Sequence, residues 1–339
     1  MDCKYIVFSQ FYLKIFILYP ALILQSKYYF CYESFLTFML HIQPKDIPVG
    51  ELHQYLLGAV GPRPIALAST LDQYGNPNLS PFSFFNVFSA NPPIAIFSPA
   101  RRVRNNTTKH TLENVLDNKE VVINVVSYDI VQQTSLSSTE YESGVNEFIK
   151  SGLTAVESEL VKPFRVKESP VQMECVVNEV IPLGQEGGAG NLVICEIKML
   201  HINENILNDM GAIDPNKIDL VGRMGGNWYC RSSQDALFEV EKPIRNLGIG
   251  IDNIPSRIRN SYILSGNDLG MLGNMESIPS IDEVEKYKKE NYTIKEILNF
   301  SAEDEEAREA LYYRAKELLK KGRISEAWKT LLIDKLNRT

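Results

Sequence analysis

Short apolar runs along the middle of the chain predict mostly β-structure. Runs bounded by turn-forming residues occur at residues 64–70, 79–89, 94–99 and 120–126. Residues 120–126 are apolar in both phases of the alternation, which is typical of a strand buried on both faces. Residues 171–183 and 191–202 flank a glycine-rich loop, so they are expected to form a long hairpin. Many strands with few helices predict an antiparallel barrel.

Helical spacing of apolar residues occurs before the first predicted strand, between the third and fourth predicted strands, and in the tail. Residues 48–60 and 111–118 predict short helices, the second with Thr111 as its N-cap. Ser280 and Ser301 each precede an acidic residue three positions later, so each is expected to start a helix with a capping box. Gly322 is expected to end the second of these helices. The amphipathic tail is expected to pack on the barrel rather than to mediate self-association.

A change in composition divides the chain into three parts. Residues 1–38 form an apolar extension, residues 39–235 form the barrel domain, and residues 236–339 form a loop-rich and then helical extension. The apolar segment at residues 5–24 is interrupted by Lys14 and Pro20, so it is interpreted as an extension foreign to the domain. A membrane-spanning role for it is the less favoured alternative, and no membrane contact is expected.

Charge and cysteine usage exclude several classes of protein. The net charge of −7 leaves no excess of positive charge for a nucleic-acid partner, so any basic patch must serve a small anion. The five cysteines contain no C-x-x-C pair, which argues against a disulfide framework and favours a reducing, cytoplasmic location. The four histidines lack metal-ligand spacing, so no metal site is predicted.

The stretch from Ser80 to Thr111 joins an aromatic, hydroxyl-rich half to a basic half. Its phenylalanines could be plain core residues, yet the serines and the asparagine among them each need a partner, and Pro81 indicates an edge strand or a bulge. The basic half, from Arg101 to Lys109, precedes a predicted helix start and could hold a phosphate or simply face water. Together the halves fit a flat heteroaromatic ring joined to a phosphate, such as flavin mononucleotide (FMN).

The motifs of this region resemble those of a known family. "GPRPIALASTLDQYGNPNLSPFSFFNVFSANPPIAIFSP", "KHTLEN" and "LVGRMGGNWYCR" are similar in order and spacing to the flavin reductase-like family of FMN-binding split barrels. That family includes flavoredoxin and the reductase components of two-component monooxygenases. The resemblance extends from about Gly58 to Tyr229. His110 departs from the pattern, because many members have Asp at this position.

The resemblance implies a split β-barrel with peripheral helices that acts as a homodimer, with one FMN in each barrel near the subunit interface. By resemblance, the flavin is lined by Ser69, Thr70, Ser80, Phe82, Ser83, Phe84, Phe85 and Asn86. Contacts to the phosphate or the ribityl chain are implied for Ser98, Lys109 and Thr111. Arg63 either serves the reduced flavin or a nicotinamide phosphate, or is structural. Trp228 and Tyr229 either line the pocket or belong to the core.

The predicted activity is hydride transfer from NADH or NADPH to the flavin, which passes electrons to a redox protein or a monooxygenase. No G-x-G-x-x-G follows a strand, so the nicotinamide nucleotide is expected to dock transiently over the flavin. Two alternatives stay open. One is an electron-transfer flavoprotein that does not use NAD(P)H directly. The other is a non-catalytic flavin-binding protein whose helical tail binds a partner.

Overall fold

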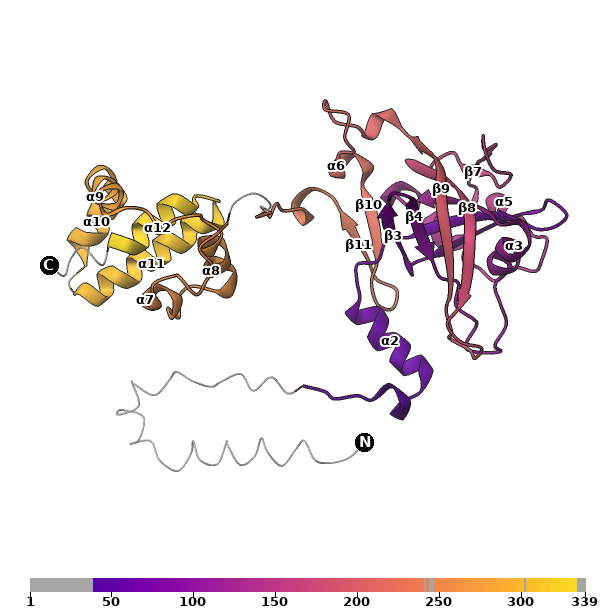
Figure 1. Ribbon diagram of the computed structural model, residues 1–339, viewed down its shortest axis with the longest axis horizontal. Helices are drawn as coiled ribbons and strands as arrows, with labels where there is room; N and C mark the ends of the chain where they lie inside the picture. Colours follow the sequence, from indigo (N-terminus) through magenta and orange to yellow (C-terminus); the bar gives the residue numbers. More distant parts are fainter. Residues whose placement is uncertain (1–38, 241, 244–246, 302, 334–339) are drawn as a thin grey trace, which may run out of the picture. The chain divides into compact units, whose positions relative to one another are not determined.

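The chain folds into two compact units that divide between Leu237 and Phe238, here named the barrel unit and the helical unit (Figure 1). The computed structural model describes residues 39–240, 242–243, 247–301 and 303–333. The predicted N-terminal extension, residues 1–38, lies outside the described residues. Among the described helices, none has the length and apolar character needed to cross a bilayer.

One antiparallel sheet dominates the barrel unit. Its strands are β1 (Ala66–Leu71), β2 (Pro77–Phe82), β3 (Phe85–Ala90), β4 (Pro93–Phe97), β5 (Glu120–Val125), β8 (Val171–Pro182) and β9 (Asn191–Ile202). Their order is β2-β1-β5-β8-β9-β4-β3, and every pair is antiparallel. The prediction of an antiparallel β-fold with additional helices is confirmed. The β5 strand lies between β1 and β8 and is buried along most of its length, as its apolar sequence predicted.

The single strand predicted at residues 79–89 is wrong, because the chain bends at Ser83 and Phe84. The bend separates β2 from β3, which lie at the two ends of the strand order. Consecutive strands at opposite edges require the sheet to curl, and this curl produces the open barrel. Pro81 lies in β2, a terminal strand of the sheet, and pairs with Leu67 of β1. Proline has no backbone N–H to donate, and it is tolerated on a terminal strand because one side of that strand has no partner.

Short helices and two small strand pairs complete the barrel unit. The helices are α2 (Val49–Ala59), α3 (His110–Asn118), α4 (Val131–Leu136), α5 (Glu147–Ser151) and α6 (Pro215–Ile218), with 3-10 turns at Pro44–Asp46, Tyr128–Ile130, Glu204–Ile206 and Gln234–Ala236. The small pairs are β6 (Ala155–Val156) with β7 (Arg165–Val166), and β10 (Leu220–Arg223) with β11 (Tyr229–Ser232). The predicted helix at residues 48–60 is confirmed as α2.

The predicted N-cap of the helix near residue 111 is wrong. The α3 helix begins at His110, Lys109 is its N-cap residue, and no side chain caps it. Thr111 lies within the first turn, and its hydroxyl donates to Asn78 Oδ1 at 2.7 Å instead of to the helix backbone. An acceptor on the neighbouring β2 strand therefore determines the role of Thr111, which no local pattern reveals.

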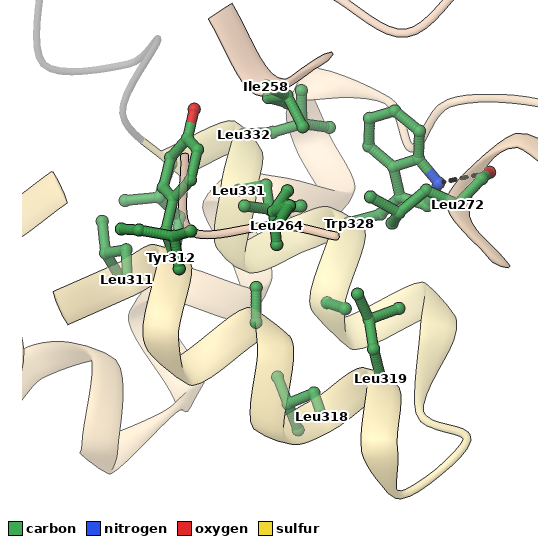
Figure 2. Close-up of a cluster of buried hydrophobic side chains, with 14 of the residues drawn as sticks. Ile258, Leu264, Leu272, Leu311, Tyr312, Leu318, Leu319, Trp328, Leu331 and Leu332 are labelled. Atoms are coloured by element: carbon green, nitrogen blue, oxygen red, sulfur yellow. Dashed lines mark hydrogen bonds between the residues drawn. The ribbon is translucent and has the colours of Figure 1, made fainter. Parts of the chain in front are cut away.

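The helical unit has a core of its own, which the sequence analysis did not predict (Figure 2). It contains α7 (Ser256–Arg259), α8 (Gly266–Gly273), α9 (Ile281–Glu290), α10 (Tyr292–Phe300), α11 (Asp304–Lys320) and α12 (Ile324–Leu332). Trp328 is fully buried at its centre, and its indole N–H donates to the Leu272 carbonyl at 3.0 Å. Leu318 and Leu331 bring α11 and α12 into the same cluster. The apolar faces of the tail are thus buried against one another.

The two predicted capping boxes have different outcomes. Ser280 forms its box as predicted: it accepts the Glu283 N–H, and its own N–H donates to the Glu283 carboxylate at 2.8 Å. Ser301 instead follows the last residue of α10 and donates to the Ile297 carbonyl at 2.8 Å. The sequence analysis missed α10, which uses this serine at its C-terminal end before α11 begins. Gly322 ends α11 in the left-handed region, with φ of 69°, as predicted.

Candidate functional site

Two cavities adjoin each other in the barrel unit and share Ser138 in their linings. The larger cavity, of about 660 Å³, is lined by residues of β2, α4, β10 and β11. The smaller cavity is lined by residues of β2, α3 and the segment that follows α4. Ser80 faces the smaller cavity, whereas Pro81 and Ser83 face the larger one. The β2 strand therefore contributes to both cavities from alternate positions.

Lys109 and the first turn of α3 give the smaller cavity a positive end. Lys109 immediately precedes the helix, where unpaired backbone N–H groups and the helix dipole favour an anion. Its Nζ lies 5.5 Å from the centroid of the Phe82 ring. Burial and, secondarily, the charge of Arg102 lower the pKa of Lys109, while Glu140 opposes them. Lowering in this direction shows that the ammonium group is poorly solvated and would gain from an anionic ligand.

A buried hydrogen-bond network forms the wall of this cavity beside Lys109. Thr111 is 1% exposed and donates to Asn78 Oδ1 at 2.7 Å. Thr70 donates to the same oxygen at 3.4 Å and accepts from Asn114 Nδ2 at 2.9 Å. Thr70 and Thr111, predicted separately as flavin and phosphate contacts, are therefore joined through Asn78. The network fixes both hydroxyl groups in one orientation.

Glu147 terminates this network at the start of α5. Its side chain accepts Asn78 Nδ2 at 3.2 Å and the Leu79 N–H at 3.0 Å. Burial raises the pKa of Glu147, while its hydrogen bonds and the charge of His110 partly offset that effect. Glu147 is only 4% exposed and lies in the lining of the smaller cavity. It is a titratable group beside the candidate anion site that the sequence analysis missed.

The basic run from Arg101 to Arg104 is mostly engaged in protein contacts. Arg101 binds the side chain and carbonyl of Asn106, both at 2.6 Å. Arg102 lines the smaller cavity, pairs with Glu140 at 3.2 Å and binds the Thr108 carbonyl. Arg104 also pairs with Glu140, at 2.8 Å, and is exposed. Of these three arginines, Arg102 is thus the one that the structure places at the cavity.

Two arginines and two tyrosines border the larger cavity. The Arg223 guanidinium lies 4.6 Å from the centroid of the Tyr229 ring, and the Arg231 guanidinium lies 3.9 Å from that of Tyr128. Arg231 also binds Asp219 with both ends of its guanidinium, at 2.7 and 2.6 Å. This wall combines flat aromatic surface with positive charge, which suits an aromatic ligand that carries electron-rich oxygens.

Thr134 supplies an unsatisfied polar group in the lining of the larger cavity. It is buried on α4, and within the described part of the chain its Oγ1 has no hydrogen-bond partner. A buried hydroxyl without a partner costs about 1–3 kcal/mol, so such groups usually meet a ligand or an ordered water. The orphaned hydroxyl is therefore consistent with a polar ligand in this cavity.

The Arg63 side chain binds backbone carbonyl groups of the protein. Its guanidinium donates to the carbonyls of Leu57, Val60 and Met224, which join the end of α2 to the β10–β11 loop. Burial, together with the charge of Arg223, lowers its pKa. Three carbonyl acceptors leave little donor capacity for a ligand, so the geometry supports the structural alternative for Arg63.

Several other predicted site residues lie outside the two cavities. Phe82 packs against Phe97, with ring centroids 5.3 Å apart. Ser98 accepts the Asn191 N–H at 3.1 Å. Of the remaining members, Ser69 is buried in β1, Phe85 and Asn86 lie on β3, and Phe84 lies exposed in the bend before β3.

The two aromatic residues at the start of β11 differ, and neither belongs to the core. Trp228 is 77% exposed, whereas Tyr229 lines the larger cavity. The site residues that sequence reasoning missed are Asn78, Thr134, Ser138, Glu147 and Arg223. Asn78 and Arg223 lie within the quoted motifs, so position in a motif could have indicated them. Thr134, Ser138 and Glu147 carry no such local signal.

An exposed apolar surface is formed by α2, the bend at Phe84 and β3. His53 of α2 makes an edge contact with Phe84, with ring centroids 6.2 Å apart. Phe88 on β3 is 65% exposed, and Tyr55 and Leu56 on α2 are also exposed. Gathered apolar side chains of this kind typically mark an interaction surface.

Comparison with known proteins identifies the barrel unit. Residues 59–215 match the model of the flavin reductase like domain. A curated relative from Aquifex aeolicus (strain VF5), described as an uncharacterized protein, is 35% identical over 196 residues. That match covers 58% of this chain and 97% of the relative. The family match ends before the helical unit begins.

Solved structures agree with this assignment. Nitrilotriacetate monooxygenase component B from Bacillus cereus is 28% identical with a TM-score of 0.56, and the match covers 60% of this chain and 99% of that protein. A protein with a split barrel domain from Shewanella frigidimarina NCIMB 400 is 26% identical with a TM-score of 0.51. The match covers 60% of this chain and 100% of that protein. The sheet described above is therefore a split barrel.

Proposed function

This chain belongs to the flavin reductase-like family, and from that premise we propose that it binds FMN and reduces it with NADH or NADPH. The proposal adds three statements to family membership: the identity of the flavin, the hydride donor and the residues that hold the cofactor. Each rests on the geometry of the two adjoining cavities.

The observation that carries the proposal is the pairing of a large, aromatic-walled cavity with a small, positive one. A volume of about 660 Å³ is within the range of small-molecule sites and accommodates a flat tricyclic ring. The Lys109 end suits a phosphate. Because β2 contributes to both cavities, one extended ligand can reach from Tyr229 to Lys109 along that strand. FMN has this shape, with a ring at one end and a phosphate at the other.

The residues of the chain would bind and orient the cofactor rather than react. Thr134 would satisfy its orphaned hydroxyl on a polar edge of the ring, and Arg223 would favour negative charge on that ring. Lys109 would hold the phosphate. When bound, the flavin supplies the hydride-accepting chemistry itself, so no side-chain acid or base is needed.

We also propose a homodimer and an electron acceptor. A second copy of the chain would cover the apolar surface formed by α2, the bend at Phe84 and β3, where the predicted flavin contacts Phe84 and Asn86 lie. The likeness to a monooxygenase component B supports a monooxygenase or another redox protein as the acceptor of reduced flavin.

Consumption of NADH and NADPH tests the proposal. Purified protein with excess FMN should oxidise one or both nucleotides, and the rate should depend on both protein and flavin. Retention of FMN without nucleotide oxidation, together with reduction by a reduced redox protein, would instead support the electron-transfer alternative. Protein that neither takes up added FMN nor oxidises a nucleotide in its presence would refute every flavin-binding proposal. A chain truncated after residue 235 tests the non-catalytic alternative, because retained activity with lost association would assign residues 236–339 to partner binding.

A further inference from the structure

Glu147 governs the direction of the hydrogen bonds beside the candidate phosphate site. An ionised carboxylate can only accept hydrogen bonds. The Asn78 side chain must therefore present its Nδ2 to Glu147, at 3.2 Å, and turn its Oδ1 toward the two threonines. This amide orientation follows from the chemistry of the carboxylate, although nitrogen and oxygen of an amide have nearly the same shape.

The orientation of Asn78 decides what Thr111 can offer to a ligand. A threonine hydroxyl has one hydrogen, and Thr111 donates it to Asn78 Oδ1 at 2.7 Å. Thr111 lines the smaller cavity, so it would present only oxygen lone pairs to a phosphate placed there. Phosphate oxygens are acceptors and require donors. With Glu147 ionised, Thr111 is therefore mismatched to the ligand that the resemblance assigns to it.

Protonation of Glu147 would reverse the hydrogen bonds that run from Glu147 through Asn78 to Thr111. The carboxylic acid O–H would donate to Asn78 Oδ1, and the rotated Nδ2 would donate to Thr111 Oγ1. The hydrogen of Thr111 would then be free for the phosphate, and a negative charge would be removed from the neighbourhood. Burial raises the pKa of Glu147, so the protonated form is favoured relative to an exposed glutamate.

We propose that Glu147 is a positioning residue that acts through Asn78 on Thr111, so that binding of the FMN phosphate takes up a proton at Glu147. This inference rests on the proposed function. It adds a specificity element, because the proton is linked to the phosphate end of the ligand and not to the ring.

Other ionisable groups near Glu147 can also exchange protons when FMN binds, so their contribution must be distinguished from that of Glu147. The charged or titratable residues that line the cavities on either side of Glu147 are Asp72, Tyr74, Arg102, Lys109, His110, Glu113, Asp117, Glu140 and Tyr141. His110 is the histidine among them, so it is separated from Glu147 by substitution. The phosphate also titrates, with a second pKa of about 6, but binding of its dianion to a positive site releases protons. Its effect therefore has the opposite sign to the proposed uptake.

Calorimetry on the wild-type protein tests the inference directly. FMN and riboflavin are titrated near pH 7 in buffers of different ionisation enthalpy, which gives the number of protons exchanged on binding. Net uptake with FMN and none with riboflavin is expected, and the uptake should persist in H110N. Absence of uptake, or its loss in H110N, overturns the inference. A wild-type protein that binds neither flavin overturns the proposed function as well.

The variant E147Q provides the second test, because a glutamine resembles the protonated acid in shape and donor capacity. The ratio of FMN affinity to riboflavin affinity should rise about three- to tenfold at neutral pH, the size of one hydrogen bond. Proton uptake should disappear. The gain should be absent from the double variant E147Q/T111V. An unchanged or lower ratio in E147Q overturns the inference, and wild-type calorimetry decides the matter if E147Q does not fold.

Discussion

The barrel unit and the helical unit bury polar groups to different extents. The barrel unit encloses ionisable and amide side chains such as Asn114, Asn124, Glu147 and Glu174, which are held in hydrogen-bond networks. The helical unit has a core of leucine, isoleucine and tryptophan side chains. A core of the first kind orients specific donors and acceptors, whereas one of the second kind mainly fixes packing. This difference places the candidate chemistry in the barrel unit.

Substitution of the two tryptophans of the chain should give the largest difference in stability. Trp328→Ala removes the centre of the helical core and should destabilise that unit by about 3–5 kcal/mol. Trp228→Ala, the matched control on an exposed side chain, should change stability by less than about 0.5 kcal/mol. Chemical denaturation measures both changes. Flavin affinity should survive in Trp328→Ala, and its complete loss would show that the two cores are not separable in function.

The buried carboxylate of Glu174 should give the next largest effect. Glu174 accepts the N–H groups of Glu159 and Leu160 at 2.8 and 2.6 Å, and it binds His201 Nε2 at 2.7 Å. Because it breaks a buried, hydrogen-bonded charge, Glu174→Gln should destabilise the barrel unit by about 3 kcal/mol at neutral pH. Glu159→Gln, an exposed control, should cost less than about 1 kcal/mol.

Glu174 should also make the stability of the barrel unit depend on pH in the acid range. Burial alone would raise the pKa of Glu174, but the hydrogen bonds that it accepts outweigh burial and lower it. The contribution of Glu174 to the free energy of unfolding is therefore complete above the unfolded-state pKa of about 4.3. It is lost as the pH falls through the pKa in the folded state, which is lower. Denaturation curves across this range should show a smaller acid loss in Glu174→Gln. An equal loss in both proteins would contradict the assignment.

Lys109→Ala should separate the basic residues that touch the ligand from those that do not. Loss of one charged hydrogen bond should weaken FMN by about 1.5–3 kcal/mol and leave riboflavin nearly unchanged. Arg104→Ala, on an exposed side chain outside the smaller cavity, should leave both affinities nearly unchanged. Equilibrium titration with both flavins measures the difference. Unchanged FMN affinity in Lys109→Ala would remove this residue from the phosphate site.

The two serines that looked alike in the sequence should give the smallest effect. Ser280→Ala removes a capping side chain and should destabilise the helical unit by about 1 kcal/mol. Ser301→Ala removes only a hydroxyl bound to the Ile297 carbonyl, so it should have a smaller effect. Equal losses in thermal denaturation would indicate that the capping box of Ser280 contributes no more than the ordinary hydrogen bond of Ser301.

Features determined by neighbouring residues could be predicted from the sequence. In the turn between β1 and β2, Asp72 accepts the N–H groups of Tyr74 and Asn76, both at 2.8 Å, and Gly75 adopts φ of 86°, which are the local interactions typical of these residue types. The long β8–β9 hairpin follows from alternation around a glycine-rich loop in the same way. In both cases the decisive contacts lie within a few residues or across one turn.

Features determined by distant contacts could not be predicted. The bend at Ser83 exists because β2 and β3 pair with different partners, and no residue near the bend records those pairings. Thr111 was predicted as a helix cap, but Asn78, 33 positions away, takes its hydrogen. Glu147 reaches Asn78 and Leu79 across 69 and 68 positions. The aromatic and basic halves of the stretch from Ser80 to Thr111 indicated a ligand, but the network that shapes its site required the fold.

Anaerobic addition of NADH or NADPH to the FMN-loaded protein tests the proposed function most directly. The flavin absorbance should bleach stoichiometrically with at least one of the two nucleotides, and air should restore it. Bleaching by dithionite or by a reduced redox protein, but by neither nucleotide, would contradict the assignment of this chain as an NAD(P)H-dependent flavin reductase.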